Sequence, residues 1–133
     1  MKPIMVEIAP GELLDKITIL QIKRARLTQP EKLRNVQVEL ATLETARNVA
    51  VAASETLDQL IADLRAVNEA LWVIEDDIRL CERDGDFGPK FIELARSVYK
   101  QNDKRAALKR AINDLLGSKI IEEKAYAKYD KKS

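Results

Sequence analysis

The chain has 133 residues, of which 46% are hydrophobic and 34% charged, and its formal net charge is +1. This length fits one domain, and so large a charged fraction favours thin helical packing over a deep globular core. The single cysteine excludes an intrachain disulfide and a cysteine-rich metal site. The absence of histidine excludes histidine-based catalysis and the common zinc and iron sites. We therefore expect no metal and no cofactor.

Composition also bears on location and partners. The sequence has no recognisable signal peptide and no run of 18 apolar residues, which predicts a cytoplasmic protein that does not enter a membrane. A near-neutral net charge argues against a nucleic-acid partner. Four glycines and four prolines are too few for the frequent turns of a sandwich or barrel. The composition thus favours an all-α fold.

The first half of the predicted single domain, 1–133, contains an arm and two helices. Residues 1–9 are apolar and contain a proline, which predicts an extended arm or a single edge strand. Helices one and two are placed within residues 10–53. Pro10 suits the first position of one helix, and Pro30 ends that helix and begins the next. We expect a break near residues 50–54, although a continuous helix through this glycine-free stretch stays open.

A long helical hairpin is predicted over residues 54–116. Apolar residues spaced three and four apart form a seam of coiled-coil type from about 55 to 83, and a second helix runs from Pro89 to 116. The short loop at 84–88 makes the two helices antiparallel neighbours. The fold class is therefore an antiparallel helical bundle built on this hairpin. Residues 117–133 are predicted to form a short helix and a frayed tail.

Charge is unevenly distributed along the hairpin. Residues 54–86 carry ten acids and three bases, a net charge of −7, whereas residues 100–133 carry ten bases and five acids, a net charge of +5. One interpretation is that the acidic and basic helices pair with each other inside the fold. The alternative is a basic surface that binds an acidic partner.

Several polar residues interrupt stripes that should be apolar, and they form the candidate site. These residues are Asp15, Lys16, Glu75, Arg79, Asn102, Arg105 and Lys109. One interpretation is a set of interhelical salt bridges. The other is a mixed-charge pocket in which Arg105 and Lys109 hold an anionic group. Glu75 or Asp76 would then act as acid, base or metal ligand. We favour no metal site, because adjacent carboxylates on a helix cannot converge.

Several segments resemble a family of uncharacterised all-helical bacterial proteins of about this length. The segments are residues 10–20 (PGELLDKITIL), 22–23 (IK), 71–79 (LWVIEDDIR), 91–99 (FIELARSVY) and 102–109 (NDKRAALK). The resemblance covers most of the chain but implies no activity. It does suggest an association with sugar-transfer and cell-surface polysaccharide proteins.

Two functional hypotheses follow. The first is a helical protein-interaction or assembly module, a homodimer with a possible further protein partner, because a thin hairpin leaves apolar surface to cover. The second is a small helical enzyme or anion-binding protein that acts on a phosphorylated or carboxylated small molecule. The sequence does not decide whether the protein is an enzyme.

Overall fold

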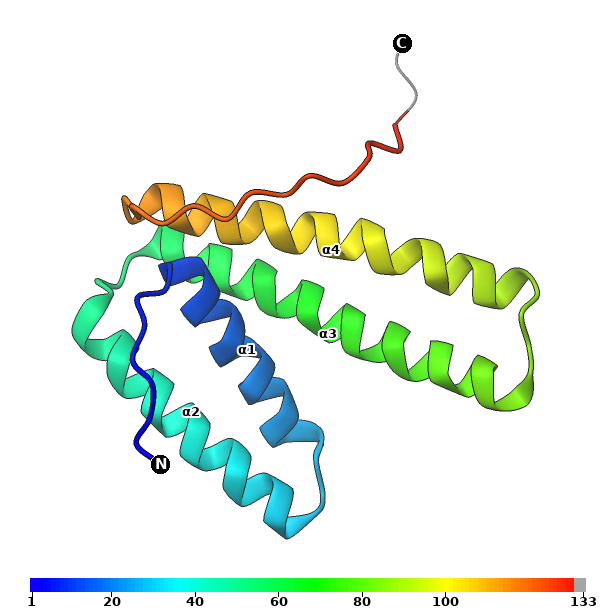
Figure 1. Cartoon of the computed structure of the whole chain (residues 1–133), viewed down its shortest axis with the longest axis horizontal. Helices are drawn as coiled ribbons and strands as arrows, with labels where there is room; N and C mark the ends of the chain where they lie inside the picture. Colours follow the sequence, from blue (N-terminus) through cyan, green and yellow to red (C-terminus); the bar gives the residue numbers. More distant parts are fainter. Residues whose placement is uncertain (131–133) are drawn as a thin grey trace.

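The computed structural model describes residues 1–130, and within them it contains four α-helices (Figure 1). In chain order these are α1 (Pro10–Arg26), α2 (Pro30–Ala50), α3 (Glu55–Asp84) and α4 (Pro89–Leu115). These residues form no strand, so the all-α prediction is confirmed. Proline opens three of the four helices, as the sequence indicated.

The predicted break between the second and third helices is present. Residues 51–54 are not helical, and Ser54 caps α3, because its hydroxyl accepts a hydrogen bond of 3.1 Å from the backbone N–H of Leu57. The hairpin turn is likewise determined by residues within the turn itself. Gly85 adopts a left-handed conformation with φ of 66°, and the next N–H, that of Asp86, bonds to the carbonyl of Cys81 at 2.9 Å.

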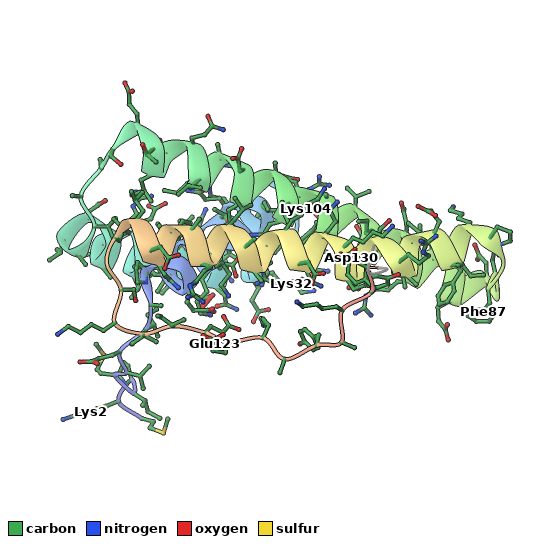
Figure 2. The ribbon with its side chains drawn as sticks, turned by 90° about the horizontal axis from the view of Figure 1, so that it is seen from above. Lys2, Lys32, Phe87, Lys104, Glu123 and Asp130 are labelled. Carbon is green, nitrogen blue, oxygen red and sulfur yellow. The ribbon has the colours of Figure 1, made fainter. Side chains whose placement is uncertain are left out.

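Two predictions at the chain ends need correction or refinement. The short helix expected after residue 117 does not form within 118–130; this segment, which we call the tail, is extended and runs beside α4 (Figures 1 and 2). Gly117 ends the helical region with a positive φ of 68°. The arm, residues 1–9, is extended but pairs with no strand. Residues 131–133, the predicted frayed end, lie outside the described residues.

The core lies at one end of the hairpin. Helix α1 packs against both α3 and α4, and α2 packs on the outer side of α1 (Figure 1). The fully buried side chains of the core include Leu14, Ile17, Leu64 and Ile112. This arrangement places three helices around α1, so a polar side chain on the covered faces of α1 meets little water.

The other end of the hairpin extends beyond α1 and α2 (Figure 1). Between residues 69 and 111, Cys81 is the only side chain in the buried class. We call residues 72–101, which include the turn with Phe87 at its tip, the distal hairpin (Figure 2). Its two helices pack on each other, and near its base the Tyr99 ring also contacts the Tyr129 ring of the tail. None of the helices in residues 1–130 combines the length and apolar character needed to cross a lipid bilayer.

Candidate functional site: a buried polar cluster and the groove beside it

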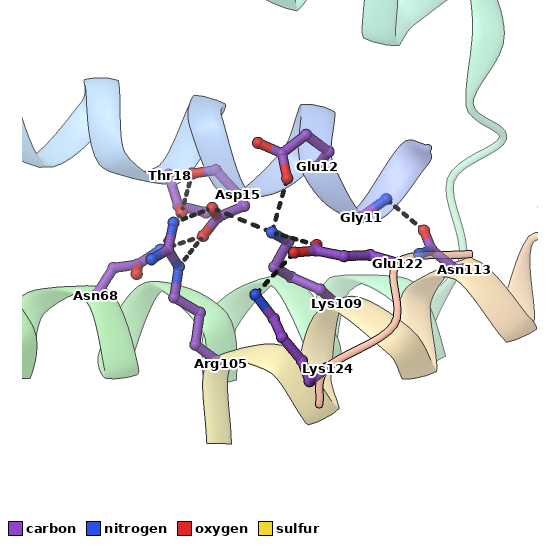
Figure 3. Close-up of polar contacts among 10 residues, drawn as sticks. All are labelled: Gly11, Glu12, Asp15, Thr18, Asn68, Arg105, Lys109, Asn113, Glu122 and Lys124. Carbon is purple, nitrogen blue, oxygen red and sulfur yellow. Dashed lines mark hydrogen bonds and ion pairs between the residues drawn. The ribbon is translucent and has the colours of Figure 1, made fainter. Parts of the chain in front are cut away.

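The start of α1 is fixed to α4 by a backbone contact. Pro10 has no N–H, and the N–H of Gly11 donates to the Asn113 side-chain oxygen at 2.7 Å (Figure 3). The next two amides, of Glu12 and Leu13, bond to the carbonyl of residue 9. All N–H groups in the first turn therefore have partners although no side chain of the preceding residue caps the helix. This docking brings the next turn of α1 against α4.

Asp15 is the centre of the resulting cluster. Its side chain is 1% exposed, and both of its carboxylate oxygens accept hydrogen bonds from Arg105 of α4, one of them from Nε at 2.9 Å (Figure 3). Asn68 of α3 donates to the same carboxylate at 2.9 Å. A two-pronged guanidinium–carboxylate pair is among the strongest ion-pair geometries in proteins. The Asp15 carboxylate thus joins α1 to both arms of the hairpin.

A threonine completes the hydrogen bonding around Asn68. The Thr18 hydroxyl donates to the Asp15 backbone carbonyl at 2.8 Å and accepts from the Asn68 amide at 2.9 Å. Both hydrogens of the Asn68 amide group are therefore used, one on Thr18 and one on Asp15. Within residues 1–130 no buried side-chain nitrogen or oxygen lacks a partner. The cluster is fully satisfied, which is the condition for a buried polar network to stabilise a fold.

Lys109, one turn after Arg105, extends the cluster toward the tail. Its ammonium group lies 2.7 Å from a carboxylate oxygen of Glu12 and 3.3 Å from one of Glu122, with Asp15 at 3.9 Å. Burial, the largest single influence, lowers the pKa of Lys109. The hydrogen bonds and negative charges of its three carboxylate partners outweigh it and hold the pKa above its ordinary value. Lys109 is therefore a fixed positive charge at neutral pH.

Two further pKa shifts describe the same charge pairing. The hydrogen bond from Arg105 to Asp15 raises the pKa of the guanidinium. Hydrogen bonds from Lys124 and then Lys109 lower the pKa of Glu122. Lys124 lies 2.8 Å from Glu122, so this glutamate of the tail bridges two lysines (Figure 3). We call the set of Glu12, Asp15, Thr18, Asn68, Arg105, Lys109 and Glu122 the polar cluster.

The structure brings together three of the seven candidate residues predicted from the sequence. Asp15, Arg105 and Lys109 belong to the polar cluster. Asn102 is exposed and lines a groove next to it, described below. Glu75 is exposed and lines a separate hollow of about 280 Å³, which Arg105 also lines.

The remaining candidates, Lys16 and Arg79, are exposed and have no ion-pair partner within residues 1–130. The candidate site predicted from the sequence did not include four residues of the polar cluster: Glu12, Thr18, Asn68 and Glu122. Thr18 could have been found because it lies three residues after Asp15 on the same helix face. Glu122 carried no local signal.

The charge interpretation made from the sequence needs correction. Within the described residues no ion pair joins α3 to α4, so acidic α3 and basic α4 do not neutralise each other through direct contacts. The bases of α4 pair instead with α1 through Asp15 and Glu12, and with the tail through Glu122 and Glu123. The reason is geometric: the face of α4 that carries Arg105 and Lys109 contacts α1.

A groove of about 630 Å³ lies between α4 and the tail. We call it the tail groove. It is lined by three tyrosines, and the rings of Tyr99 and Tyr129 meet edge to face with centroids 5.2 Å apart. Arg105 and Lys109 form part of its inner wall. Each of these cations already has carboxylate partners, which argues against their holding a small anion.

No group of three or more carboxylate or cysteine side chains is arranged to hold a metal ion in residues 1–130. Cys81 is buried as a free thiol in the distal hairpin. The chemical capacity of this region therefore rests on tyrosine rings, paired charges and amide groups.

The raised pKa of Lys109 predicts a loss of stability at alkaline pH. An unfolded lysine titrates near pH 10.4, so its stabilising contribution is complete below that pH and is lost as the pH rises through the higher folded value. Melting temperatures measured from about pH 9 to 12 should therefore fall more steeply in the wild type than in Lys109→Met. Lys16→Met, an exposed control on α1, should keep the wild-type slope. Equal slopes for wild type and Lys109→Met would contradict the prediction.

The fold and its cluster define a class: an all-helical protein in which a short helical pair is locked onto one end of a long hairpin by a buried ionic network. The chain belongs to a family described as "Family of unknown function (DUF6165)", which it matches over residues 4–130. No curated protein and no solved structure shows a significant match to it. The expected membership of an uncharacterised helical family is thereby confirmed, without an activity.

Proposed function

We propose that the protein is a homodimeric helical assembly module and that it self-associates through the distal hairpin. The observation that carries this proposal is the exposure of large apolar side chains on both of its arms and at its tip. They are Val73, Leu80, Phe87 and Ile92, which are 45–55% exposed. Isolated apolar residues are normal on protein surfaces, but several of them on one projecting element suit an interface.

A two-helix element is too thin to bury its own apolar residues. Each helix of a hairpin has one neighbour, so its other faces meet water unless a further layer covers them. At the proximal end α1 supplies that layer, and Leu64 and Ile112 are completely buried there. At the distal end nothing in the described chain does so. A second hairpin would complete a four-helix bundle, in which the inward-facing side chains of all four helices form a core.

Charge favours a second copy of this chain as the partner. Within the distal hairpin, residues 72–86 carry six acids and two bases, a net charge of −4, and residues 87–101 carry three bases and one acid, a net charge of +2. These charges form no ion pair between the two arms. A twofold axis places the acidic arm of each copy on the basic arm of the other, which satisfies the self-complementarity that a twofold interface needs.

The test is the mass in solution. Light scattering at micromolar concentration should give about twice the 15.1 kDa of one chain. Substituting glutamate for Leu80 and Ile92 together should return the mass to that of one chain, because a buried unpaired carboxylate opposes association. The matched control substitutes glutamate for Val38 and Val49, which are exposed valines of α2, and should leave the dimer intact. Circular dichroism checks that both variants remain helical.

Two outcomes would overturn the proposal. A wild-type mass of one chain at micromolar concentration removes the dimer. A dimer that survives Leu80→Glu with Ile92→Glu but dissociates with the α2 control places the interface elsewhere.

A further inference from the structure

We propose that the tail groove binds an uncharged saccharide, a ligand class that the assembly function does not require. The groove is about 630 Å³, within the range of cavities that hold small organic ligands. One wall is α4, which is fixed in the fold by Arg105 and Lys109. The other wall is the tail, which is held by Glu122. The groove therefore has one wall on a packed helix and one wall on an extended segment.

Aromatic side chains are concentrated in this groove. The chain contains three tyrosines, and all of them, Tyr99, Tyr126 and Tyr129, line it. Tyr99 comes from α4, and the other two come from the tail. The faces of aromatic rings carry partial negative charge and attract the weakly positive C–H faces of sugar rings, while the phenol hydroxyls remain free for hydrogen bonds. The rings of Tyr99 and Tyr129 meet edge to face. The Lys124 ammonium lies over one face of the Tyr126 ring, 5.9 Å from its centroid, so this largely exposed ring offers its other face.

The charges in the groove argue for a neutral ligand. Arg105 is paired with Asp15, Lys109 with Glu12 and Glu122, and Lys124 with Glu122. An anion would have to compete with these carboxylates, of which Asp15 is buried, and would gain little net attraction. A ligand without charge meets no such penalty. It can form hydrogen bonds with the paired side chains without separating them.

Polar groups suited to sugar hydroxyls lie beside the rings. Asn102 is exposed on α4 and presents both a donor and an acceptor to the groove. Asp103 lines the groove as well and offers carboxylate oxygens that can accept hydrogen bonds. Alternating donors and acceptors next to aromatic faces match the two surfaces of a sugar ring, its hydroxyl rim and its C–H face.

Titration followed by backbone amide NMR tests the proposal on the full chain. The probes are maltotriose and triacetylchitotriose as neutral saccharides, and glucose 1-phosphate and inorganic phosphate as anions. A neutral saccharide should shift the amides of residues 98–109 and 124–129 in a saturable way and more strongly than either anion. Tyr126→Ala should weaken binding about 3–10-fold through the lost ring contact, whereas Tyr126→Phe should retain most of the affinity. Phe87→Ala, which removes an exposed ring at the hairpin tip, should not change it.

Three results would overturn the proposal: no saturable shift with either neutral saccharide, tighter binding of phosphate than of the saccharides, or unchanged affinity in Tyr126→Ala. Because Tyr126 is mostly exposed, this variant should fold normally. Repeating the titration with the Leu80→Glu and Ile92→Glu variant separates this inference from dimerisation. The groove is formed within one chain and should bind equally well in that variant.

Discussion

Replacing Asp15 with alanine is expected to reduce the free energy of unfolding by about 3 kcal/mol. The substitution removes the carboxylate to which Arg105 and Asn68 donate and that lies 3.9 Å from Lys109. Removing one partner of a buried ion pair is costly because the other charge stays desolvated without compensation. We place the loss at the lower end of the usual range because the Arg105 side chain is 30% exposed and can reach water. Urea denaturation at pH 7 and fixed protein concentration measures it.

Two comparisons separate this cause from a general effect of substitution. Lys16→Ala changes the next residue of α1, which is exposed, and should alter stability by no more than about 0.5 kcal/mol. Replacing Asp15 and Arg105 together with leucine should cost clearly less than Asp15→Ala, since neither charge then remains buried without a partner. If Asp15→Ala proved as mild as Lys16→Ala, the polar cluster would not hold the helices together.

The helices could be predicted from the sequence because their boundaries are local. Pro10, Pro30 and Pro89 begin helices, and Gly85 ends one with the left-handed conformation that glycine adopts at low cost. The tail could not be predicted in this way. Its conformation depends on the contact between Glu122 and Lys109, which are 13 residues apart. Helical periodicity in the sequence does not predict such a contact.

The two basic residues of the site on α4 could also be predicted from a local pattern. Arg105 and Lys109 stood out because they lie on a stripe that otherwise carries apolar residues, and such exceptions mark buried polar groups or function. Their partners could not be assigned. The sequence indicated that basic α4 would pair with acidic α3, but the choice of partner depends on which helix covers that face of α4. Tertiary packing alone places α1 there and thereby selects Asp15.

Gly11→Ala is expected to destabilise the protein by about 1–3 kcal/mol, although alanine normally stabilises a helix relative to glycine by about 1 kcal/mol. A Cβ at this position would lie 2.5 Å from the backbone carbonyl oxygen of Lys109 and 2.8 Å from the side-chain oxygen of Asn113. A backbone atom inside α4 cannot move aside as a flexible side chain can. Helix α1 would have to shift away from α4. Urea denaturation measures the loss under the conditions used for Asp15→Ala.

Gly88→Ala provides the matched control, because the nearest atom to its added Cβ lies at 3.4 Å and its φ is −81°, a value open to alanine. It should change stability by less than about 0.5 kcal/mol.

A second substitution, Asn113→Ala, tests whether the close approach of α1 to α4 is the cause. Asn113→Ala leaves the buried Gly11 N–H without its partner and should be destabilising in the wild type. In the Gly11→Ala background, where α1 has already moved away, Asn113→Ala should cost less. Strictly additive effects, or a stabilising Gly11→Ala, would mean that α1 and α4 do not approach this closely in solution.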